Sequence, residues 1–216
     1  MPARPRVSAV LLAAGRAERF GGGKLGAELL PGLTILARSL LGLLDEEAGL
    51  DGDVWLVGQA AVVGPWLGHL AGHPRLTLVE SSPDGGQGDS LAAGVRALPA
   101  GDAVLVALGD QPFAAPTAVR AVLARHRRAP AQAAVAAGQD GRRMPPVLFA
   151  PHLRGELEGL RGDRGARDVL SSVGAATVEM GAGAWALDVD RREDLAALRT
   201  AAARDPIACG HAGMPA

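Results

Sequence analysis

Residues 7–13 read VSAVLLA and run into the glycine- and arginine-rich loop AGRAERFGGGK at residues 14–24. A short apolar run with little polar alternation is typical of a strand that is buried on both faces, as in a parallel sheet. Ligands of open α/β sheets bind at the carboxyl ends of such strands. The stretch therefore predicts a central strand followed by a loop that lines a binding site.

The rest of the chain alternates short apolar runs with longer segments of helical period, as strands joined by crossover helices do. Strands are predicted at residues 7–13, 53–58, 75–80, 103–110, 131–137, 146–149, 175–180 and 184–189. Helices are predicted at residues 34–48, 60–70, 89–98 (capped by Asp89 or Ser90), 116–128, 151–160, 165–173 and 192–203. We expect an α/β protein with a single domain at residues 1–203, a mostly parallel central sheet with helices on both faces, and a flexible tail at residues 204–216.

The composition argues against several classes of protein. The 216 residues carry 22 basic and 23 acidic side chains, with three Phe, three Trp and no Tyr, so a general nucleic-acid binder is not expected. The single cysteine, Cys209, allows no internal disulfide and predicts a reduced, cytoplasmic protein. Because no run of about 18 apolar residues occurs, no membrane span is expected either.

The loop at residues 14–24 has the composition of a phosphate-binding loop. Glycines let backbone amides turn toward an anion, and Arg and Lys side chains supply charge that a polyphosphate would neutralise. Lys24 is the only lysine of the chain, whose other 21 basic residues are arginines. A Walker A loop is excluded because Leu25, rather than Ser or Thr, follows Lys24.

Two acidic positions could complete a metal site. Asp110 follows the most apolar run of the chain, in the sequence Gly109-Asp110-Gln111-Pro112, and Asp188 and Asp190 alternate before the predicted helix at residues 192–203. Carboxylates suit Mg²⁺, which shares its remaining ligands with water and phosphates. The alternatives are that Asp110 is a turn residue and that Asp190 caps a helix.

A second glycine-rich turn, GGQGDSL at residues 85–91, allows an alternative from another class of enzyme. Gly-Asp-Ser-Leu also opens a family of serine esterases, in which Ser90 would be the nucleophile. That chemistry needs a histidine base, usually in an Asp-x-x-His pair. None of the five histidines has Asp three residues before it, so the esterase hypothesis is disfavoured.

Arginines gather in two segments of the second half of the chain, RRMPPVLF at residues 142–149 and LRGDRGAR at residues 160–167. Guanidinium groups form bidentate contacts with carboxylates and phosphates, so the cluster suits a second anionic substrate. The alternative is that arginine is simply the surface cation of this protein.

These motifs together resemble a known family. Leu12-Ala13-Ala14-Gly15, Arg19 and Lys24 resemble the L-A-A-G-x-S-x-R-M-G-x-x-K signature of nucleotidyltransferases, and residues 109–112 resemble their metal-binding turn. Residues 146–149, 160–167 and 188–190 are similar to the molybdenum cofactor cytidylyltransferases. Ala17 stands where that family usually has Ser, and Phe20 where it has Met.

The resemblance implies a Rossmann-like nucleotidyltransferase fold and a Mg²⁺-dependent transfer of CMP from CTP to molybdopterin, releasing pyrophosphate. Residues 7–115 would mainly bind the nucleotide and residues 116–203 the acceptor. The implied catalytic residues are Lys24, Arg19 and Asp110. Nucleotide-binding residues would be Leu12, Ala13, Ala14, Gly15, Arg16, Arg19, Lys24, Gly86 and Ser90; acceptor-binding residues Arg142, Arg161, Asp163 and Arg164; and metal ligands Asp110 and Asp190.

Three other functions remain open from the sequence. A guanylyltransferase acting on the same pterin usually has L-A-G-G in place of residues 12–15, and a methylerythritol phosphate cytidylyltransferase shares the first loop. A non-catalytic carrier or insertion chaperone for the pterin would be expected to have lost the metal ligands. Besides CTP and molybdopterin, the resemblance implies a partner that receives the product, the apo form of a molybdenum hydroxylase.

Overall fold

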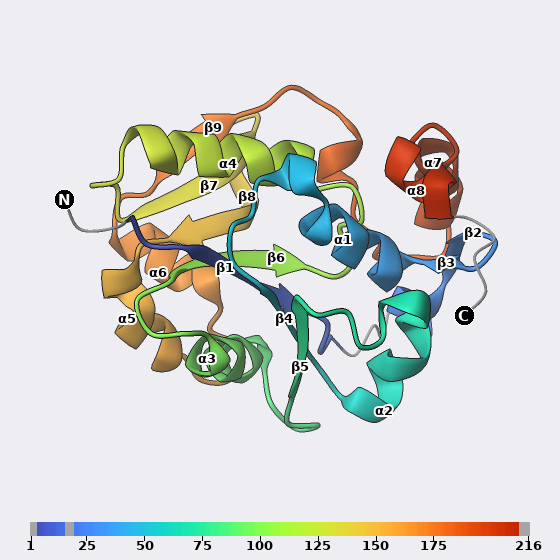
Figure 1. The fold of residues 1–216 in the computed structure, drawn as a ribbon, viewed down its shortest axis with the longest axis horizontal. Coiled ribbons are helices and arrows are strands. Elements are labelled where there is room, and N and C mark those ends of the chain that lie inside the picture. The colour runs from blue at the N-terminus through green and yellow to red at the C-terminus, as the bar shows by residue number, and fades with distance from the viewer. Residues whose placement is uncertain (1–3, 16–19, 212–216) are drawn as a thin grey trace.

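A computed structural model describes residues 4–15 and 20–211 and contains a seven-stranded sheet (Figure 1). Its strand order is β5-β4-β1-β6-β8-β7-β9. The strands are β1 (Val7–Leu12), β4 (Val54–Gly58), β5 (Leu76–Glu80), β6 (Ala103–Leu108), β7 (Ala134–Gln139), β8 (Arg142–Phe149) and β9 (Ala176–Glu179). Every neighbouring pair is parallel except those of β8, which runs antiparallel to β6 and β7, so the predicted mostly parallel sheet is confirmed.

Helices cover both faces of this sheet, as the sequence predicts. The helices are α1 (Ile35–Leu44), α2 (Ala60–Val63), α3 (Gln87–Ala97), α4 (Thr117–Arg128), α5 (Arg154–Glu158), α6 (Ala166–Ser172), α7 (Asp194–Ala202) and α8 (Pro206–His211). One apolar core lies between the sheet and helices α1 and α4 and extends to residues of α7 and α8, of which α8 contacts α1. A second core lies between the sheet and α3, α5 and α6. All six residues of β1 are buried, which explains its lack of polar alternation.

Several elements differ from the sequence prediction. Residues 184–189, predicted as a strand, instead begin with the short 3-10 helix Ala184–Ala186. The backbone N–H groups of Ala186 and Leu187 donate to Gly183 and Ala184, and the buried Trp185 donates its indole N–H to Gly181, so local bonds replace strand pairing. Helix α3 begins at Gln87 rather than at residue 89.

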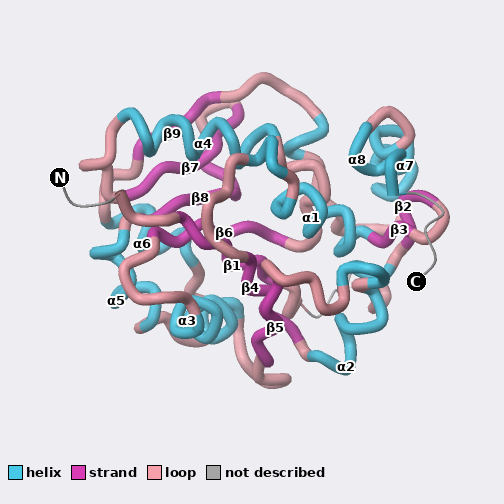
Figure 2. The backbone as a smooth tube through the Cα atoms, in the orientation of Figure 1, coloured by secondary structure: helices cyan, strands magenta, loops and turns pink. Residues whose placement is uncertain are grey.

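A small hairpin of β2 (Glu28–Leu30) and β3 (Leu33–Thr34) was not predicted from the sequence. In Figure 2 it lies beside α7 and α8, and Arg199 of α7 donates to the carbonyl of Glu28 at 3.1 Å. Helix α7 thereby contacts the segment that follows the glycine-rich loop.

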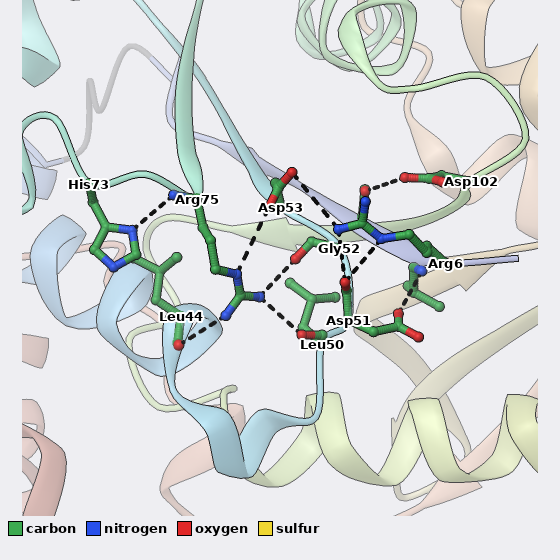
Figure 3. Close-up of polar contacts among 11 residues, drawn as sticks. Arg6, Leu44, Leu50, Asp51, Gly52, Asp53, His73, Arg75 and Asp102 are labelled. Carbon is green, nitrogen blue, oxygen red and sulfur yellow. Dashed lines mark hydrogen bonds and ion pairs between the residues drawn. The ribbon is translucent and has the colours of Figure 1, made fainter.

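The amino ends of the strands are held by a polar network at the edge opposite to the carboxyl ends (Figure 3). The Arg75 guanidinium donates to the carbonyls of Leu44, Leu50 and Gly52. Arg6 donates to the carbonyl of Asp51. These arginines satisfy backbone acceptors and brace the loops at this edge.

The tail expected from residue 204 is partly helical, because residues 206–211 form α8. Asp205, just before this helix, accepts a bond from Arg38 of α1 at 2.7 Å, and its other carboxylate oxygen accepts the Ala208 N–H. The Arg38 side chain is 1% exposed. A buried guanidinium therefore needs the C-terminal segment as its counter-charge.

Asp205→Ala is expected to lower the free energy of unfolding by about 3 kcal/mol, because it leaves the buried Arg38 charge without a carboxylate. Urea denaturation measures this loss. The matched control is Asp168→Ala, which breaks an exposed ion pair with Arg164 and should cost less than about 1 kcal/mol. Equal losses in the two variants would contradict the role assigned to the buried pair.

No helix in the described part of the chain combines the length and the apolar character that crossing a membrane requires.

Candidate active site

A cavity of about 680 Å³ opens at the carboxyl ends of β1 and β6, where the sequence predicts ligand binding. Nine of the predicted site residues line it: Leu12, Ala13, Ala14, Gly15, Lys24, Gly86, Ser90, Asp110 and Asp163. Other lining residues were not predicted as site residues: Leu25, Asp84, Gly85, Gln87, Asp89, Leu108 and Gly162. Most of these lie at residues 84–90, in or beside the second glycine-rich turn, or directly follow a predicted site residue. Their closeness in sequence to predicted site residues could have identified them.

Lys24 is the cation at the centre of this site. It begins a short 3-10 helix, Lys24–Gly26, after Gly23, whose φ of 62° is a conformation that favours glycine. The Lys24 ammonium donates to Oδ2 of Asp110 at 2.6 Å and lies 3.9 Å from Oδ1 of Asp190. Its side chain is only 13% exposed. The one lysine of the chain thus joins two carboxylates from distant segments.

Backbone hydrogen bonds bring these segments together. The Gly109 N–H donates to the Leu12 carbonyl at 2.9 Å, which holds the end of β6 beside the end of β1. The Val189 N–H then donates to the Asp110 carbonyl at 3.2 Å. Asp110 therefore lies between the glycine-rich loop and the segment that contains Asp190.

Negative charge is concentrated around Asp110. The pKa of Asp188 is raised above its usual value by burial and by the neighbouring carboxylates of Asp190 and Asp110. The N–H groups of Asp190 and Arg191 donate to Asp194, which lowers the pKa of Asp194. Asp194 thus accepts the N–H groups that precede α7, and the Asp190 carboxylate faces Lys24 rather than capping that helix.

The carboxylates do not form a complete metal cage by themselves. In the parts of the chain that the structure describes, no three His, Cys, Asp or Glu side chains gather closely enough to hold an ion. A cation bound at Asp110 and Asp190 would need further oxygen ligands from water or from a substrate phosphate, as Mg²⁺ commonly does.

The start of α3 forms the opposite wall of the cavity. The Gly86 N–H donates to Oδ2 of Asp89 at 3.0 Å, and the buried Ser90 hydroxyl donates to the Gly86 carbonyl at 3.2 Å. The sequence predicts Asp89 or Ser90 as the N-cap residue, but the N-cap is Gly86. Asp89 is the third residue of the helix and accepts the N–H of Gly86, and Ser90 donates to the Gly86 carbonyl. Because the Ser90 hydroxyl is used in this way, the structure gives the esterase hypothesis no support.

None of the arginines predicted as site residues is among the described residues that line the cavity. Arg16 and Arg19 lie outside the described residues. Arg161 donates to the carbonyls of Glu158 and Leu160, and Arg164 pairs with Asp168 at 3.1 Å on the surface. Arg142 is exposed at the start of β8. Of the four predicted acceptor residues, Asp163 is the one found among the lining residues of the described cavity.

A smaller cavity of about 190 Å³ adjoins the first across the same loop. It shares Ala13, Ala14, Gly15, Lys24 and Leu25 with the larger one and adds Gly23, Gln59, Val62, Trp66 and Pro83. The described residues of the glycine-rich loop and its flanks therefore line two adjoining cavities.

A mostly parallel sheet with a glycine-rich loop, a lysine and an aspartate meeting at its carboxyl edge is typical of α/β proteins that bind nucleotides. The chain belongs to the family described as the MobA-like NTP transferase domain, whose profile matches residues 9–178. This membership supports nucleotidyl transfer as its activity. A comparison with curated protein sequences finds no match.

Solved structures share the fold. Rv0371c from Mycobacterium tuberculosis is 24% identical, with a TM-score of 0.71 over 91% of this chain and 98% of that one. A nucleotidyl transferase from Methanothermobacter (Mth528) is 22% identical, with a TM-score of 0.71 over 92% and 98%. A CMP:2-keto-3-deoxy-manno-octonic acid synthetase solved with CTP is 15% identical, with a TM-score of 0.72 over 92% and 99%. The single-domain nucleotidyltransferase fold expected from the sequence is thus confirmed.

Proposed function

We propose that this protein transfers CMP from CTP to the terminal phosphate of molybdopterin, forming the cytosine dinucleotide of the pterin and pyrophosphate. The observation that carries the proposal is the Lys24 ammonium, which lies between Asp110 and Asp190 at the end of the glycine-rich loop. An ammonium group beside two carboxylates at this edge suits nucleotidyl transfer, in which the phosphates of the nucleotide and of the acceptor must be held close together and their charge neutralised.

The reaction would be an in-line displacement at the α-phosphorus of CTP. A terminal phosphate oxygen of the acceptor forms the new P–O bond, and the bond between the α-phosphorus and the bridging oxygen breaks, so that pyrophosphate leaves with the electron pair. Lys24, with Arg16 and Arg19 from the same loop, would neutralise the charge that develops on the leaving group. Such catalysis depends mainly on positioning and on electrostatics.

The base would lie between the two glycine-rich segments. Leu12, Ala13 and Ala14 line one side of the cavity, and Gly86 and Ser90 line the other. Backbone groups can read the donor and acceptor edge of cytosine without side-chain bulk. A relative of the same fold was solved with CTP, which favours CTP as the nucleotide.

A divalent cation, Mg²⁺ in the proposal, fits Asp110 and Asp190. The two carboxylates lie 2.6 and 3.9 Å from the Lys24 ammonium and supply the oxygen ligands that Mg²⁺ prefers. The similar Rv0371c was solved in complex with manganese. When bound, the cation would neutralise charge on the α-phosphate.

Acceptor binding is proposed for the wall beyond Asp110. Asp163 lines the cavity, Arg161 and Arg164 lie in the same loop as Asp163, and Arg142 is exposed at the start of β8. Because Arg164 is 76% exposed, its contact with an anionic acceptor would be solvent-screened and modest. The product would pass to an apo molybdenum hydroxylase.

Pyrophosphate release, measured with molybdopterin against each of CTP, GTP and ATP, tests the proposal. CTP should give the highest kcat/KM. Preference for GTP would establish the guanylyltransferase alternative, and release with CTP only in the presence of methylerythritol phosphate would establish the other cytidylyltransferase. Binding of pterin with no release from any nucleotide would favour a carrier.

A further inference from the structure

Two loops from different halves of the chain meet backbone to backbone at the cavity rim. The Gly88 N–H of α3 donates to the Gly162 carbonyl at 2.7 Å. A Cβ at Gly86 would lie 2.2 Å from Gly162, and one at Gly88 would lie 2.3 Å from the Arg164 carbonyl oxygen. These glycines allow an approach that no side chain would permit.

One carboxylate oxygen joins the two loops. Oδ2 of Asp89 accepts the Gly86 N–H at 3.0 Å and the Gly162 N–H at 2.9 Å. The first bond closes the start of α3, and the second reaches across to the arginine-rich loop at residues 161–165. Asp89 therefore adds a side-chain link between these loops to the backbone bond from Gly88 to Gly162, and a hydrogen bond to an ionised acceptor is stronger than a neutral one.

The other end of α3 is fastened independently. Arg154 of α5 donates to the carbonyls of Val95, Leu98 and Pro99, and Arg96 donates to the Glu158 carbonyl. Loss of the Asp89 bonds would therefore loosen residues 161–165, leaving the Gly88 N–H bond to the Gly162 carbonyl, while α3 and α5 stay packed together.

Both joined loops contribute lining residues to the same cavity. Residues 84–90 form the wall proposed for the nucleotide, whereas Gly162 and Asp163 belong to the wall proposed for the acceptor. We propose that Asp89 is a positioning residue that holds the acceptor wall against the nucleotide wall, so that one carboxylate sets the affinity for both substrates. The inference rests on the proposed function for the identity of those substrates.

The kinetic test uses Asp89→Ala and Asp89→Asn. The alanine variant should weaken CTP affinity and raise the KM for the pterin acceptor, each by about tenfold or more, because it loses two charge-assisted bonds. Its kcat at saturation should stay within about threefold of the parent, since Asp89 acts by positioning. The asparagine variant retains an acceptor oxygen and should recover most of both affinities.

Asp168→Ala is the matched control, because it removes an aspartate bonded to Arg164 of the same loop without touching the Asp89 link. It should leave CTP affinity unchanged. A change in one substrate only, a fall in kcat with both affinities intact, or equal effects of Asp89→Ala and Asp168→Ala would overturn the proposal.

Limited trypsin digestion gives a readout that needs no substrate. Cleavage after Arg161 and Arg164 should be faster in Asp89→Ala than in the parent, and near the parent rate in Asp89→Asn, with unfolding midpoints recorded for each variant. An unchanged cleavage rate in Asp89→Ala would refute the link. If the parent transferred no CMP while the loop still opened in Asp89→Ala, the proposed function would fail and the positioning role of Asp89 would stand.

Discussion

Asp110→Ala should lower the rate of nucleotidyl transfer by at least about a hundredfold while the fold survives, because charge stabilisation around a transferring phosphate contributes several kcal/mol. Asp110 follows β6 at the sheet edge, contacts Lys24 at 2.6 Å and is 24% exposed. Its carboxylate thus accepts the Lys24 hydrogen bond inside the cavity, where the proposed cation would bind. Steady-state turnover with CTP and saturating Mg²⁺ measures the loss.

The variant Asp110→Asn tests whether the negative charge of the Asp110 side chain, rather than its size, supports the reaction. It preserves the size of the side chain and one acceptor oxygen but removes the negative charge, so it should also lose most of the rate. Binding of Mn²⁺ in the presence of CTP provides a readout besides activity, and both variants should weaken it. Turnover of Asp110→Ala within tenfold of the parent would show that Asp110 is a turn residue only.

The sheet edge was predictable because a buried strand and the loop that follows it are both encoded in short, continuous stretches of sequence. The apolar run at residues 7–13 and the run ending at Asp110 each predict a buried strand, and the carboxyl ends of adjacent parallel strands lie together. Lys24 and Asp110 could therefore be assigned to one site before the fold was known.

Contacts that depend on single backbone bonds were not predictable. The bond from Val189 to the Asp110 carbonyl and the bond from Gly162 to Asp89 leave no periodic pattern in the sequence. Residues 184–189 have the alternation of a strand, yet Trp185 makes local bonds instead. Tertiary contacts decided these elements, as they often do for short segments.

The roles of the arginines could not be predicted from the sequence either. The guanidinium groups of Arg75 and Arg154 both donate hydrogen bonds to backbone carbonyls. Their residue type is identical to that of arginines proposed to bind the acceptor. Arg161, one of these, also donates to backbone carbonyls, those of Glu158 and Leu160, so residue type alone does not identify an arginine that binds a substrate.

Lys24→Ala is expected to lower kcat and kcat/KM together, by about a hundredfold or more, because the ammonium would contact charge that develops on departing pyrophosphate. The nearly buried ammonium also holds the carboxylates of Asp110 and Asp190 close to each other. Steady-state kinetics over a range of CTP concentrations separates the two parameters. An effect confined to the KM for CTP would mean uniform ground-state binding and would rule out the leaving-group role.

Lys24→Arg and a double variant complete that test. Arginine keeps the positive charge on a broader group, so it should restore part of the activity if charge is what matters. Because Lys24 and Asp110 are in direct contact, their alanine variants should be non-additive, and the double variant should lose less than the product of the two single losses. Full additivity would mean that the two side chains act independently, and that the 2.6 Å contact between them does not persist in the working enzyme.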